Sequence, residues 1–266
     1  MGFEVEASHH EIAPAQHEID FQYTDALCAA DNIMTFKLAV KTIAKRHGLF
    51  ASFMPKPKYG INGSGMHINM SLSKDGHNIF HDPDGKMGLS KEAYYFIGGI
   101  MKHMKGVTLI MNPLVNSYKR LKPGFEAPVY VAWSTLGANT LIRVPNMRGE
   151  HTRIELRSPD PAANPYLAFA ACLMAGLDGI RNQIEPPAEV QDNINILSED
   201  EAQARGLEKL PTDLLDACME MKKDTLLKDL VGDRVFDQYY ESKIAAWKEY
   251  DSQVTNWEIE SYLYKF

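Results

Sequence analysis

The spacing of apolar and polar residues predicts a strand-rich first part of the chain and a helical end. Strands are expected over residues 2–11, 17–23, 49–54, 65–73, 128–134, 140–145 and 151–157. Helical patterns cover 31–47, 90–105 and 164–183, and further helices are expected over 212–265. Asp31 and Ser90 stand where helix N-caps are expected, and Lys74-Asp75-Gly76 indicates a hairpin turn.

Composition and charge exclude several classes of protein. The chain has 266 residues, of which 45% are hydrophobic and 24% charged, as is typical of a globular protein. Its 28 basic and 35 acidic residues give a net charge of −7, so we expect neither a nucleic-acid nor a membrane partner. Cys28, Cys172 and Cys218 form no C-x-x-C pair, which suits a reducing compartment. With no signal peptide or long apolar run evident, we expect a cytoplasmic location.

Polar side chains share faces on strands that otherwise contribute to a core. His67, Asn69 and Ser71 lie on one face of 66–72, and Arg153, Glu155 and Arg157 on one face of 153–157. Glu18 and Asp20 alternate with apolar residues in the same way. Each such face could simply meet solvent. Several strands that each offer acids, a histidine or arginines favour a polar cleft.

The candidate chemistry of such a cleft follows from its donor atoms. Glu11, Glu18, His67 and Glu155 form an oxygen-rich set with one imidazole, which Mg²⁺ or Mn²⁺ prefers. Guanidinium groups recognise carboxylates and phosphates, and five arginines gather in one region: Arg120, Arg143, Arg148, Arg153 and Arg157. Cations and arginines together favour phosphoryl transfer. The glycine-rich stretch 60–66 lacks the Lys-Ser/Thr of a Walker A motif.

Four long blocks make the sequence recognisable: EASHHEIAPAQHEIDF (6–21), FMPKPKYGINGSGMHINMSL (53–72), NPLVNSYKRLKPGFEAPVYVAWS (112–134) and TRIELRSPDPAANPYLAFAACLMAGLDGI (152–180). The chain resembles the catalytic domain of type I glutamine synthetase along nearly all of its length. We expect it to be truncated, because the family's N-terminal β-grasp domain and the first part of the catalytic domain have no counterpart here.

The expected architecture is α+β, with a curved, mostly antiparallel sheet forming part of a barrel and helices packed outside. Residues 1–185 are expected to form the catalytic sheet-and-helix core, and 186–266 a C-terminal helical extension of the same domain. The family's active sites lie between adjacent subunits, so the resemblance implies a homo-oligomeric ring, a dodecamer in the full-length protein.

The resemblance implies an ATP-dependent ligase that joins ammonia to glutamate through a γ-glutamyl phosphate. It assigns Glu11 and Glu18 to one Mg²⁺ or Mn²⁺ ion and His67 and Glu155 to another. It assigns glutamate binding to Asn62, Gly63, Arg120, Glu126 and Arg157, and ATP binding to Glu6, Asn69, Ser71, Arg143 and Arg153. Glu126 would lie on a flap that closes the site, and Glu126, Arg143 and Arg157 would be catalytic. His9, His10 and His17 are interpreted as hydrogen-bonded strand residues.

Two departures from the family pattern leave alternatives open. Ala138 stands where the family usually has an arginine that touches the phosphoryl group, and Asn195 stands near the place of the adenylylation tyrosine of some relatives. The first alternative is a related ligase that attaches glutamate to an amine other than ammonia. The second is a non-catalytic relative that serves as a binding protein. The activity of this chain alone is also left open.

Overall fold

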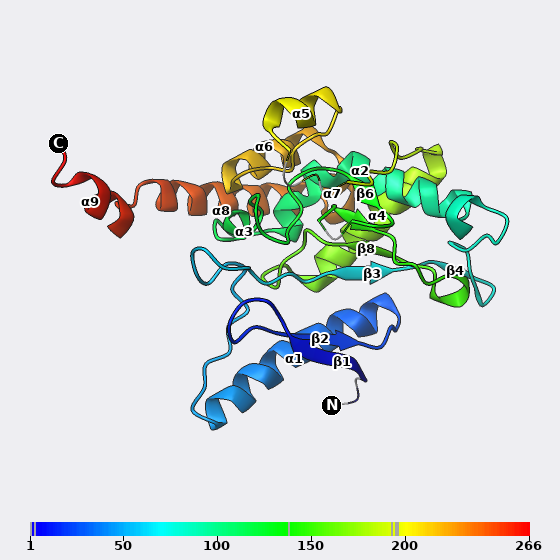
Figure 1. Ribbon diagram of the computed structural model, residues 1–266, viewed down its shortest axis with the longest axis horizontal. Coiled ribbons are helices and arrows are strands. Elements are labelled where there is room, and N and C mark those ends of the chain that lie inside the picture. Colours follow the sequence, from blue (N-terminus) through cyan, green and yellow to red (C-terminus); the bar gives the residue numbers. More distant parts are fainter. Residues whose placement is uncertain (1, 3, 138, 193, 195–196) are drawn as a thin grey trace.

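An antiparallel hairpin begins the fold. In the computed structural model, which describes residues 2, 4–137, 139–192, 194 and 197–266, β1 (Val5–His10) pairs with β2 (His17–Phe21). His9 lies opposite Glu18 in this register. The two strands form a sheet of their own, and every residue of β1 is exposed. The two strands expected near the N-terminus are therefore present, but their hairpin stands apart from the main sheet (Figure 1).

Helix α1 (Ala26–Arg46) follows the hairpin and begins earlier than the sequence predicts. Its N-cap is Asp25, whose side chain accepts a hydrogen bond from the backbone N–H of Cys28. The predicted cap, Asp31, is wrong, because this residue lies within the helix and accepts a hydrogen bond from the hydroxyl of Tyr166. The ring of Phe36 packs edge-on against Phe21, 5.2 Å between centroids, and so joins α1 to the hairpin.

The main sheet has four short strands in the order β3 (Ile68–Met70), β8 (Ile154–Leu156), β7 (Ile142–Arg143) and β6 (Trp133–Ser134). It is mostly antiparallel, as expected, with β6 and β7 parallel. The hairpin of β4 (Ser73–Lys74) and β5 (His77–Asn78) turns through Asp75 and Gly76, both with positive φ, at the predicted place. The strand predicted over 49–54 is wrong: this stretch forms no strand, and Phe50 is 92% exposed.

Two long helices, α2 (Lys91–Met111) and α4 (Pro165–Asn182), form the centre of the body. The hydroxyl of Ser90 caps α2, as predicted, by accepting a hydrogen bond from the N–H of Ala93. The helix runs past the expected end at residue 105, because its last turns are apolar and buried. A side-chain methyl at Gly99 would overlap the carbonyl oxygen of Ala175, so the two helices pack backbone to backbone.

The remaining helices are short elements and a C-terminal series. They are η1 (Lys86–Gly88), α3 (Ser117–Arg120), η2 (Gly149–His151), α5 (Glu199–Ala204), α6 (Leu214–Lys223), α7 (Leu226–Val231), α8 (Asp233–Asp251) and α9 (Asn256–Tyr262). Side chains of α6, α7 and α8 join those of α2 and α4 in one apolar cluster. Helix α5 was not predicted, whereas the helices after residue 212 were.

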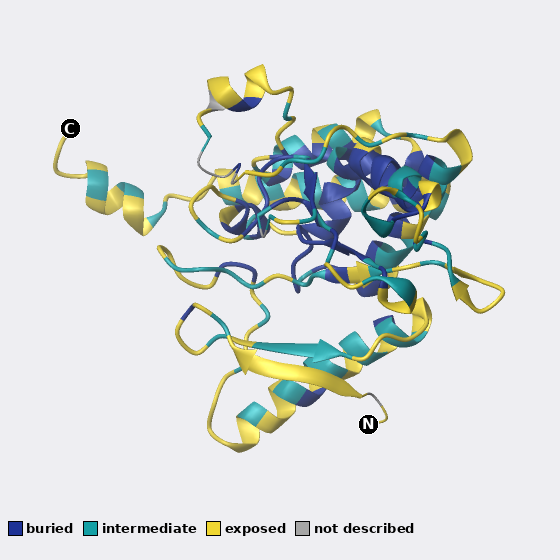
Figure 2. Ribbon diagram, turned by 45° about the vertical axis from the view of Figure 1, so that its right-hand side comes forward, coloured by how far each residue is buried: buried dark blue, intermediate teal, exposed yellow. Residues whose placement is uncertain are grey.

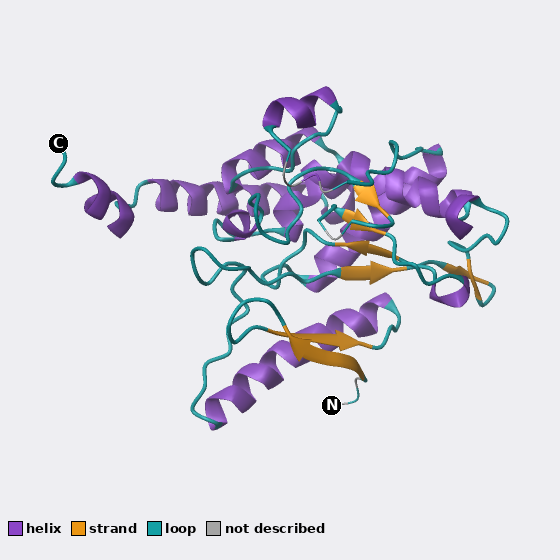
Figure 3. Ribbon diagram, viewed as in Figure 1, coloured by secondary structure: helices purple, strands orange, loops and turns teal. Residues whose placement is uncertain are grey.

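The layers explain the distribution of burial. The four-stranded sheet lies between the main group of helices and the unit formed by the hairpin and α1 (Figure 3). Buried residues concentrate where the sheet meets α2 and α4, while β1 and α9 are largely exposed and β2 is mostly intermediate (Figure 2). The architecture confirms the predicted α+β class, with open sheets. Within the described ranges, no helix is long and apolar enough to cross a membrane.

Candidate active site

Glu155, in the middle of β8, is the centre of a cluster of cationic side chains. It pairs with Asn69 of β3 on one side and Arg143 of β7 on the other, and it is 2% exposed. Its Oε1 lies 2.5 Å from Nη1 of Arg157 and 3.2 Å from Nδ1 of His67. Its Oε2 accepts a hydrogen bond of 2.5 Å from Nε of Arg143. Arg157 follows β8 directly, two residues after Glu155, and its side chain lies on the same side as that of Glu155, as the contact between them shows.

These contacts fix the protonation states of the pair formed by Glu155 and His67. Burial acts to raise the pKa of Glu155, but the hydrogen bond with His67 and the positive charges of Arg157 and Arg143 outweigh it and lower the pKa to about 2. Burial lowers the pKa of His67, and although the hydrogen bond and charge of Glu155 act to raise it, the charges of Arg157 and Arg120 act with burial. A neutral imidazole therefore faces an ionised carboxylate, which are the states in which both groups bind metal ions.

Arg120, on α3, lies behind this pair and is held rigidly. Its Nη1 and Nη2 donate to the carbonyl oxygens of Ser158 (2.7 Å) and Arg157 (3.0 Å), and its side chain is almost fully buried. A Cβ on Gly65 would lie 2.6 Å from Nη2 of Arg120 and 2.9 Å from Nε2 of His67. Glycine at position 65 thus allows the arginine and the histidine to approach one another.

Arg157 has a buried donor, its Nε, without a hydrogen-bond partner among the residues that the structure describes. A buried N–H without an acceptor is uncommon and calls for an explanation, such as an anionic ligand. This donor, together with Arg120 and Arg143, gives the sheet face the character of an anion site.

A second cluster lies on the β1–β2 hairpin and consists of carboxylates with one imidazole. His9, Glu18 and Asp20 offer ligand atoms that all lie within 4.8 Å of one another, and Nδ1 of His9 is 3.8 Å from Oε1 of Glu11. Burial, followed by the crowding of Glu11 and Asp20, raises the pKa of Glu18 to about 7. Several carboxylates close together repel one another when all are ionised, which a bound cation would relieve. Such an oxygen-rich donor set suits a hard divalent cation.

Sequence reasoning found only part of this hairpin cluster. Glu11 and Glu18 were named, whereas His9 was interpreted as a hydrogen-bonded strand residue. Asp20 carried a signal, because it shares a strand face with Glu18. The contribution of His9 depends on the pairing of β1 with β2, which places it opposite Glu18.

The four candidate metal ligands form two pairs at two different sheets. Glu11, in the turn after β1, and Glu18 on β2 belong to the hairpin, whereas His67, just before β3, and Glu155 on β8 lie at the main sheet. The turn of the hairpin reaches the loop before His67 through Gln16, whose Nε2 donates to the carbonyl oxygen of Gly63 at 2.9 Å. Gln16 thus connects the hairpin turn to the loop before His67, and no direct contact between the two pairs is found among the described residues.

The other residues expected to bind ATP lie on or next to β1, β3 and β8. Asn69 lies on β3 beside Glu155, and its Oδ1 accepts a hydrogen bond of 3.1 Å from Nε of Arg153. Ser71 follows β3 and is exposed, and Glu6 is an exposed residue of β1. Arg148, one of the five clustered arginines, donates to the backbone carbonyls of Met87, Pro145 and Met147 and is thus occupied with the fold.

Three of the expected glutamate-site residues lie on loops: Asn62 and Gly63 before His67, and Glu126 after α3. Gly63 packs against the side chain of Arg120, and Asn62 is the residue before it. Glu126 is exposed on the loop after α3, between Phe125 and the buried Ala127. The Nζ of Lys56 lies 3.3 Å from the centroid of the Phe125 ring, which fastens this loop to the body. Ala138 and Asn195 lie outside the described residues.

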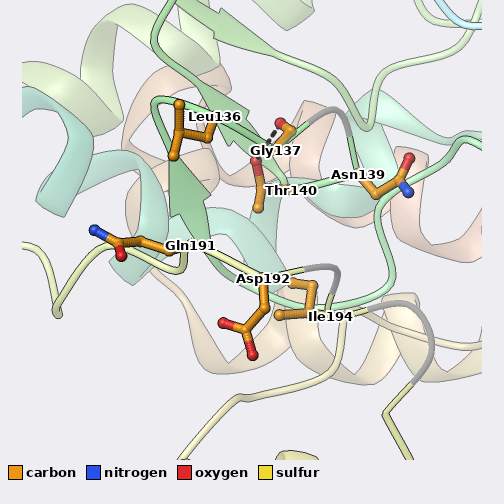
Figure 4. Close-up of a pocket in the computed structure, with 7 residues that line it drawn as sticks. All are labelled: Leu136, Gly137, Asn139, Thr140, Gln191, Asp192 and Ile194. Atoms are coloured by element: carbon orange, nitrogen blue, oxygen red, sulfur yellow. Dashed lines mark hydrogen bonds between the residues drawn. The ribbon is translucent and has the colours of Figure 1, made fainter.

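A pocket at the β6–β7 connection was not expected from the sequence. It has a volume of about 270 Å³ and is lined by Leu136, Gly137, Asn139, Thr140, Gln191, Asp192 and Ile194 (Figure 4). Among its described lining residues only Asp192 is charged, so the chemistry of this pocket differs from that of the arginine-rich face.

Fold and site together define an α+β protein with an arginine-rich sheet face and a separate carboxylate hairpin, which Gln16 connects to the loop before His67. The family description "Glutamine synthetase, catalytic domain" matches residues 1–262. The chain belongs to this family, as its four sequence blocks indicated.

Individual relatives agree with this assignment. The chain is 59% identical over 266 residues to a glutamine synthetase of Clostridium saccharobutylicum, covering 100% of the chain and 60% of the relative. A Methanosarcina mazei glutamine synthetase is 55% identical over 263 residues, covering 99% of the chain and 59% of the relative. The chain therefore spans about 60% of the length of these relatives.

Solved structures show the same fold. A structure described as a GmaS/ADP complex has a TM-score of 0.88 and 37% identity, covering 98% of the chain and 60% of that structure. A cryo-EM structure of Plasmodium falciparum glutamine synthetase has a TM-score of 0.88 and 29% identity, covering 98% of the chain and 59% of that structure.

Proposed function

We propose that this chain carries the catalytic groups of an ATP-dependent glutamate–ammonia ligase, which makes glutamine through a γ-glutamyl phosphate. The observation that carries the proposal is the position of Glu155, which is buried between Arg143 and Arg157 with His67 against it. A carboxylate and an imidazole offer metal ligands there, and the arginines offer donors to a phosphoryl group and a substrate carboxylate. Membership of the glutamine synthetase family supports this combination.

Substrate recognition is assigned to the arginines and the loop near them. Arg157 would offer to the glutamate, or to its phosphorylated form, the Nε that has no partner among the described residues, and Arg120 packs against Gly63, next to Asn62. Arg143 is the more accessible partner of Glu155, its side chain 40% exposed, so it can meet the transferring phosphoryl group. We assign the nucleotide to Glu6, Asn69, Ser71, Arg143 and Arg153.

The donor sets fit two divalent cations, Mg²⁺ or Mn²⁺. Glu11 and Glu18 would hold one of them, in the crowded carboxylate cluster of the hairpin, and His67 and Glu155 the other. Such ions supply charge neutralisation between a phosphoryl group and an attacking carboxylate. The protein's own part would be to favour the neutral form of His67, through burial, and the ionised form of Glu155, through the hydrogen bond with His67 and the charges of Arg157 and Arg143.

Glu126 is assigned to the flap that closes over the acyl phosphate and receives the proton of ammonium. Its loop is anchored on one side by Lys56 against Phe125 and on the other by the buried Ala127. This leaves Glu126 exposed between two fixed points. An acyl phosphate must be shielded from water, and a short anchored loop can do so with little reordering.

The wider organisation is also part of the proposal. We assign residues 1–185 and 186–266 to one catalytic domain, because α6, α7 and α8 contribute to the same apolar cluster as α2 and α4. We assign the protein to a homo-oligomeric ring, a dodecamer when full-length, in the cytoplasm. Its partners would be glutamate, ammonia and ATP.

The direct test is an assay of the chain with ATP, glutamate, ammonium and Mn²⁺, in which ADP and glutamine are both measured. The proposal expects the two products to form together, and it expects Glu155→Ala to abolish both. ADP release that does not depend on glutamate would contradict it. ATP and glutamate binding without turnover would favour the non-catalytic alternative.

A second candidate, a ligase for another amine, is favoured by Ala138 at the usual place of a phosphoryl-contacting arginine. The same assay with a panel of alkylamines separates the two ligases. Preference for an alkylamine over ammonium would support this candidate. A gain in glutamine formation on Ala138→Arg would instead support the ammonia ligase.

A further inference from the structure

Gln16 occupies the turn between β1 and β2, which begins with Glu11, and Glu18 follows the turn on β2. Two backbone hydrogen bonds close this turn, from the N–H of Glu11 to the carbonyl oxygen of Gln16 and from the N–H of Gln16 to that of Ala13, each 3.0 Å. Ala15 within the turn has a φ of 60°. The position of Gln16 is therefore fixed relative to both glutamates by main-chain geometry.

The side chain of Gln16 extends from this turn to the loop that precedes His67. Its Nε2 donates to the carbonyl oxygen of Gly63 at 2.9 Å and to Oγ of Ser64 at 3.3 Å. Its Oε1 is buried, and no partner for this atom is found among the residues with described positions. One primary amide thus makes two contacts to a segment 47 residues away in the chain.

The loop that receives these bonds is itself pinned to the arginine side of the site. The N–H of Ser64 donates to the carbonyl oxygen of Pro55, and the N–H of Met66 to that of Pro159, each at 2.8 Å. A Cβ on Gly63 would lie 3.2 Å from Cγ of Arg120. A shift of the loop would therefore disturb Arg120 and His67 together.

We propose that Gln16 is a positioning residue that fixes the distance between the carboxylate pair Glu11–Glu18 and the pair His67–Glu155. The inference rests on the proposed function, since it assumes that each pair holds a divalent cation. A neutral donor suits this place, because a carboxylate there would face the carbonyl oxygen of Gly63 and repel it. Residues that orient metal ligands from behind commonly change metal affinity tenfold or more when they are replaced.

The test uses Gln16→Met, which keeps the length of the side chain and removes its donor. The matched control is Gln22→Met, the same replacement at an exposed position just after β2. Mn²⁺ is titrated into each protein and followed by electron paramagnetic resonance, which reports free Mn²⁺ and the dipolar broadening between two bound ions. The broadening depends on the distance between the ions, which a general loss of stability does not alter.

The expected result is that wild type and Gln22→Met bind two Mn²⁺ ions with the same broadening. Gln16→Met should bind Mn²⁺ about tenfold more weakly and lose the broadening. Wild-type affinity and broadening in Gln16→Met would overturn the inference. If Gln16→Met does not fold, Gln16→Asn replaces it, because its shorter amide cannot reach both acceptors, and wild-type broadening in that variant would overturn the inference equally.

A further variant separates this inference from the proposed function. Glu18→Gln removes a candidate ligand and leaves Gln16 in place. If Glu18→Gln binds Mn²⁺ as wild type does, the proposed metal site is wrong, and the inference is overturned with it. If Glu18→Gln loses one ion while Gln16→Met behaves as wild type, the metal site stands and the role of Gln16 alone is refuted.

Discussion

Oε1 of Glu155 lies 2.5 Å from Nη1 of Arg157, and the side chains of these two residues are only 3% and 9% exposed. Such a buried pair gains little net stability over an apolar pair, because both ions lose their hydration. Removal of one partner has a different effect, since it leaves the other charge buried and uncompensated. The pair therefore makes the centre of the candidate site sensitive to any change of charge.

Glu155→Gln is expected to lower the free energy of unfolding by about 3–5 kcal/mol, because Arg157 and the nearby His67 lose the buried anion between them. Urea unfolding at neutral pH measures the change. Glu150→Gln, the same replacement at an exposed residue of η2, is the control and should change the free energy by less than about 0.5 kcal/mol. If Glu155→Gln and Glu150→Gln lowered the free energy of unfolding equally, the buried pair of Glu155 and Arg157 would make no specific contribution to stability.

Local signals explain the parts of the fold that the sequence predicts correctly. Asn164 caps α4 and Pro165 stands at its first position, both recognisable from residue type alone. The period of two on residues 153–157 places Glu155 and Arg157 on one face, and the contacts between them agree. Such features depend on residues close together in the chain, so they can be predicted from the sequence alone.

Features that depend on long-range pairing are not accessible in this way. The contact of Gln16 with Gly63 joins segments that share no periodic pattern. The separation of the β1–β2 hairpin from the main sheet follows from which strands pair, and alternation alone does not specify a partner. The stretch 49–54 has a strand-like composition, yet Phe50 remains exposed and no neighbouring strand pairs with it within the described residues.

Gly99→Ala is expected to destabilise the protein, although alanine is normally the better helix former. The added methyl would overlap the carbonyl oxygen of Ala175 and crowd the backbone of Gly179, so α2 and α4 would have to separate. Overpacking of this kind costs about 1–3 kcal/mol. Thermal and urea unfolding report the change.

Gly137→Ala is the matched control for this prediction. A Cβ there would meet its nearest neighbour, Oγ of Ser134, at 3.4 Å, an ordinary contact. Its stability should stay close to that of wild type. A Gly99→Ala protein that is more stable than wild type would show that the interface between α2 and α4 can adjust.

Phe125→Leu is expected to loosen the loop that carries Glu126. The change removes the aromatic face under Nζ of Lys56, an interaction worth about 1 kcal/mol when it is partly desolvated. Hydrogen exchange of a peptide covering residues 121–130 should become about fivefold faster, which corresponds to that energy. Phe50→Leu, at a position 92% exposed, should leave exchange in this peptide unchanged. Unaltered exchange in Phe125→Leu would mean that Ala127 and its neighbours hold the loop without Lys56.

His103 joins three elements of the helical body through two carboxylates. Its Nδ1 lies 2.6 Å from Oδ2 of Asp224, between α6 and α7, and its Nε2 lies 2.8 Å from Oδ2 of Asp178 on α4. Lys102 also pairs with Asp178 at 2.8 Å. Burial acts to lower the pKa of His103 and Lys102 acts in the same direction, but the hydrogen bonds and charge of the two aspartates outweigh them and raise the pKa above 6.5.

Stability should therefore depend on pH through His103, with a definite sign. A folded pKa above the unfolded value means that the imidazolium contributes fully below pH 6.5, and that this contribution is lost as the pH rises through the folded pKa. His103→Gln should lower the free energy of unfolding by about 2 kcal/mol near pH 6, the size of a hydrogen bond to a charged group, and by less near pH 9. Urea unfolding of both proteins across this range measures the difference, with His77→Gln, at an exposed residue of β5, as the control. A difference that grows with pH, or that equals the control's at every pH, would refute the charged state assigned to His103.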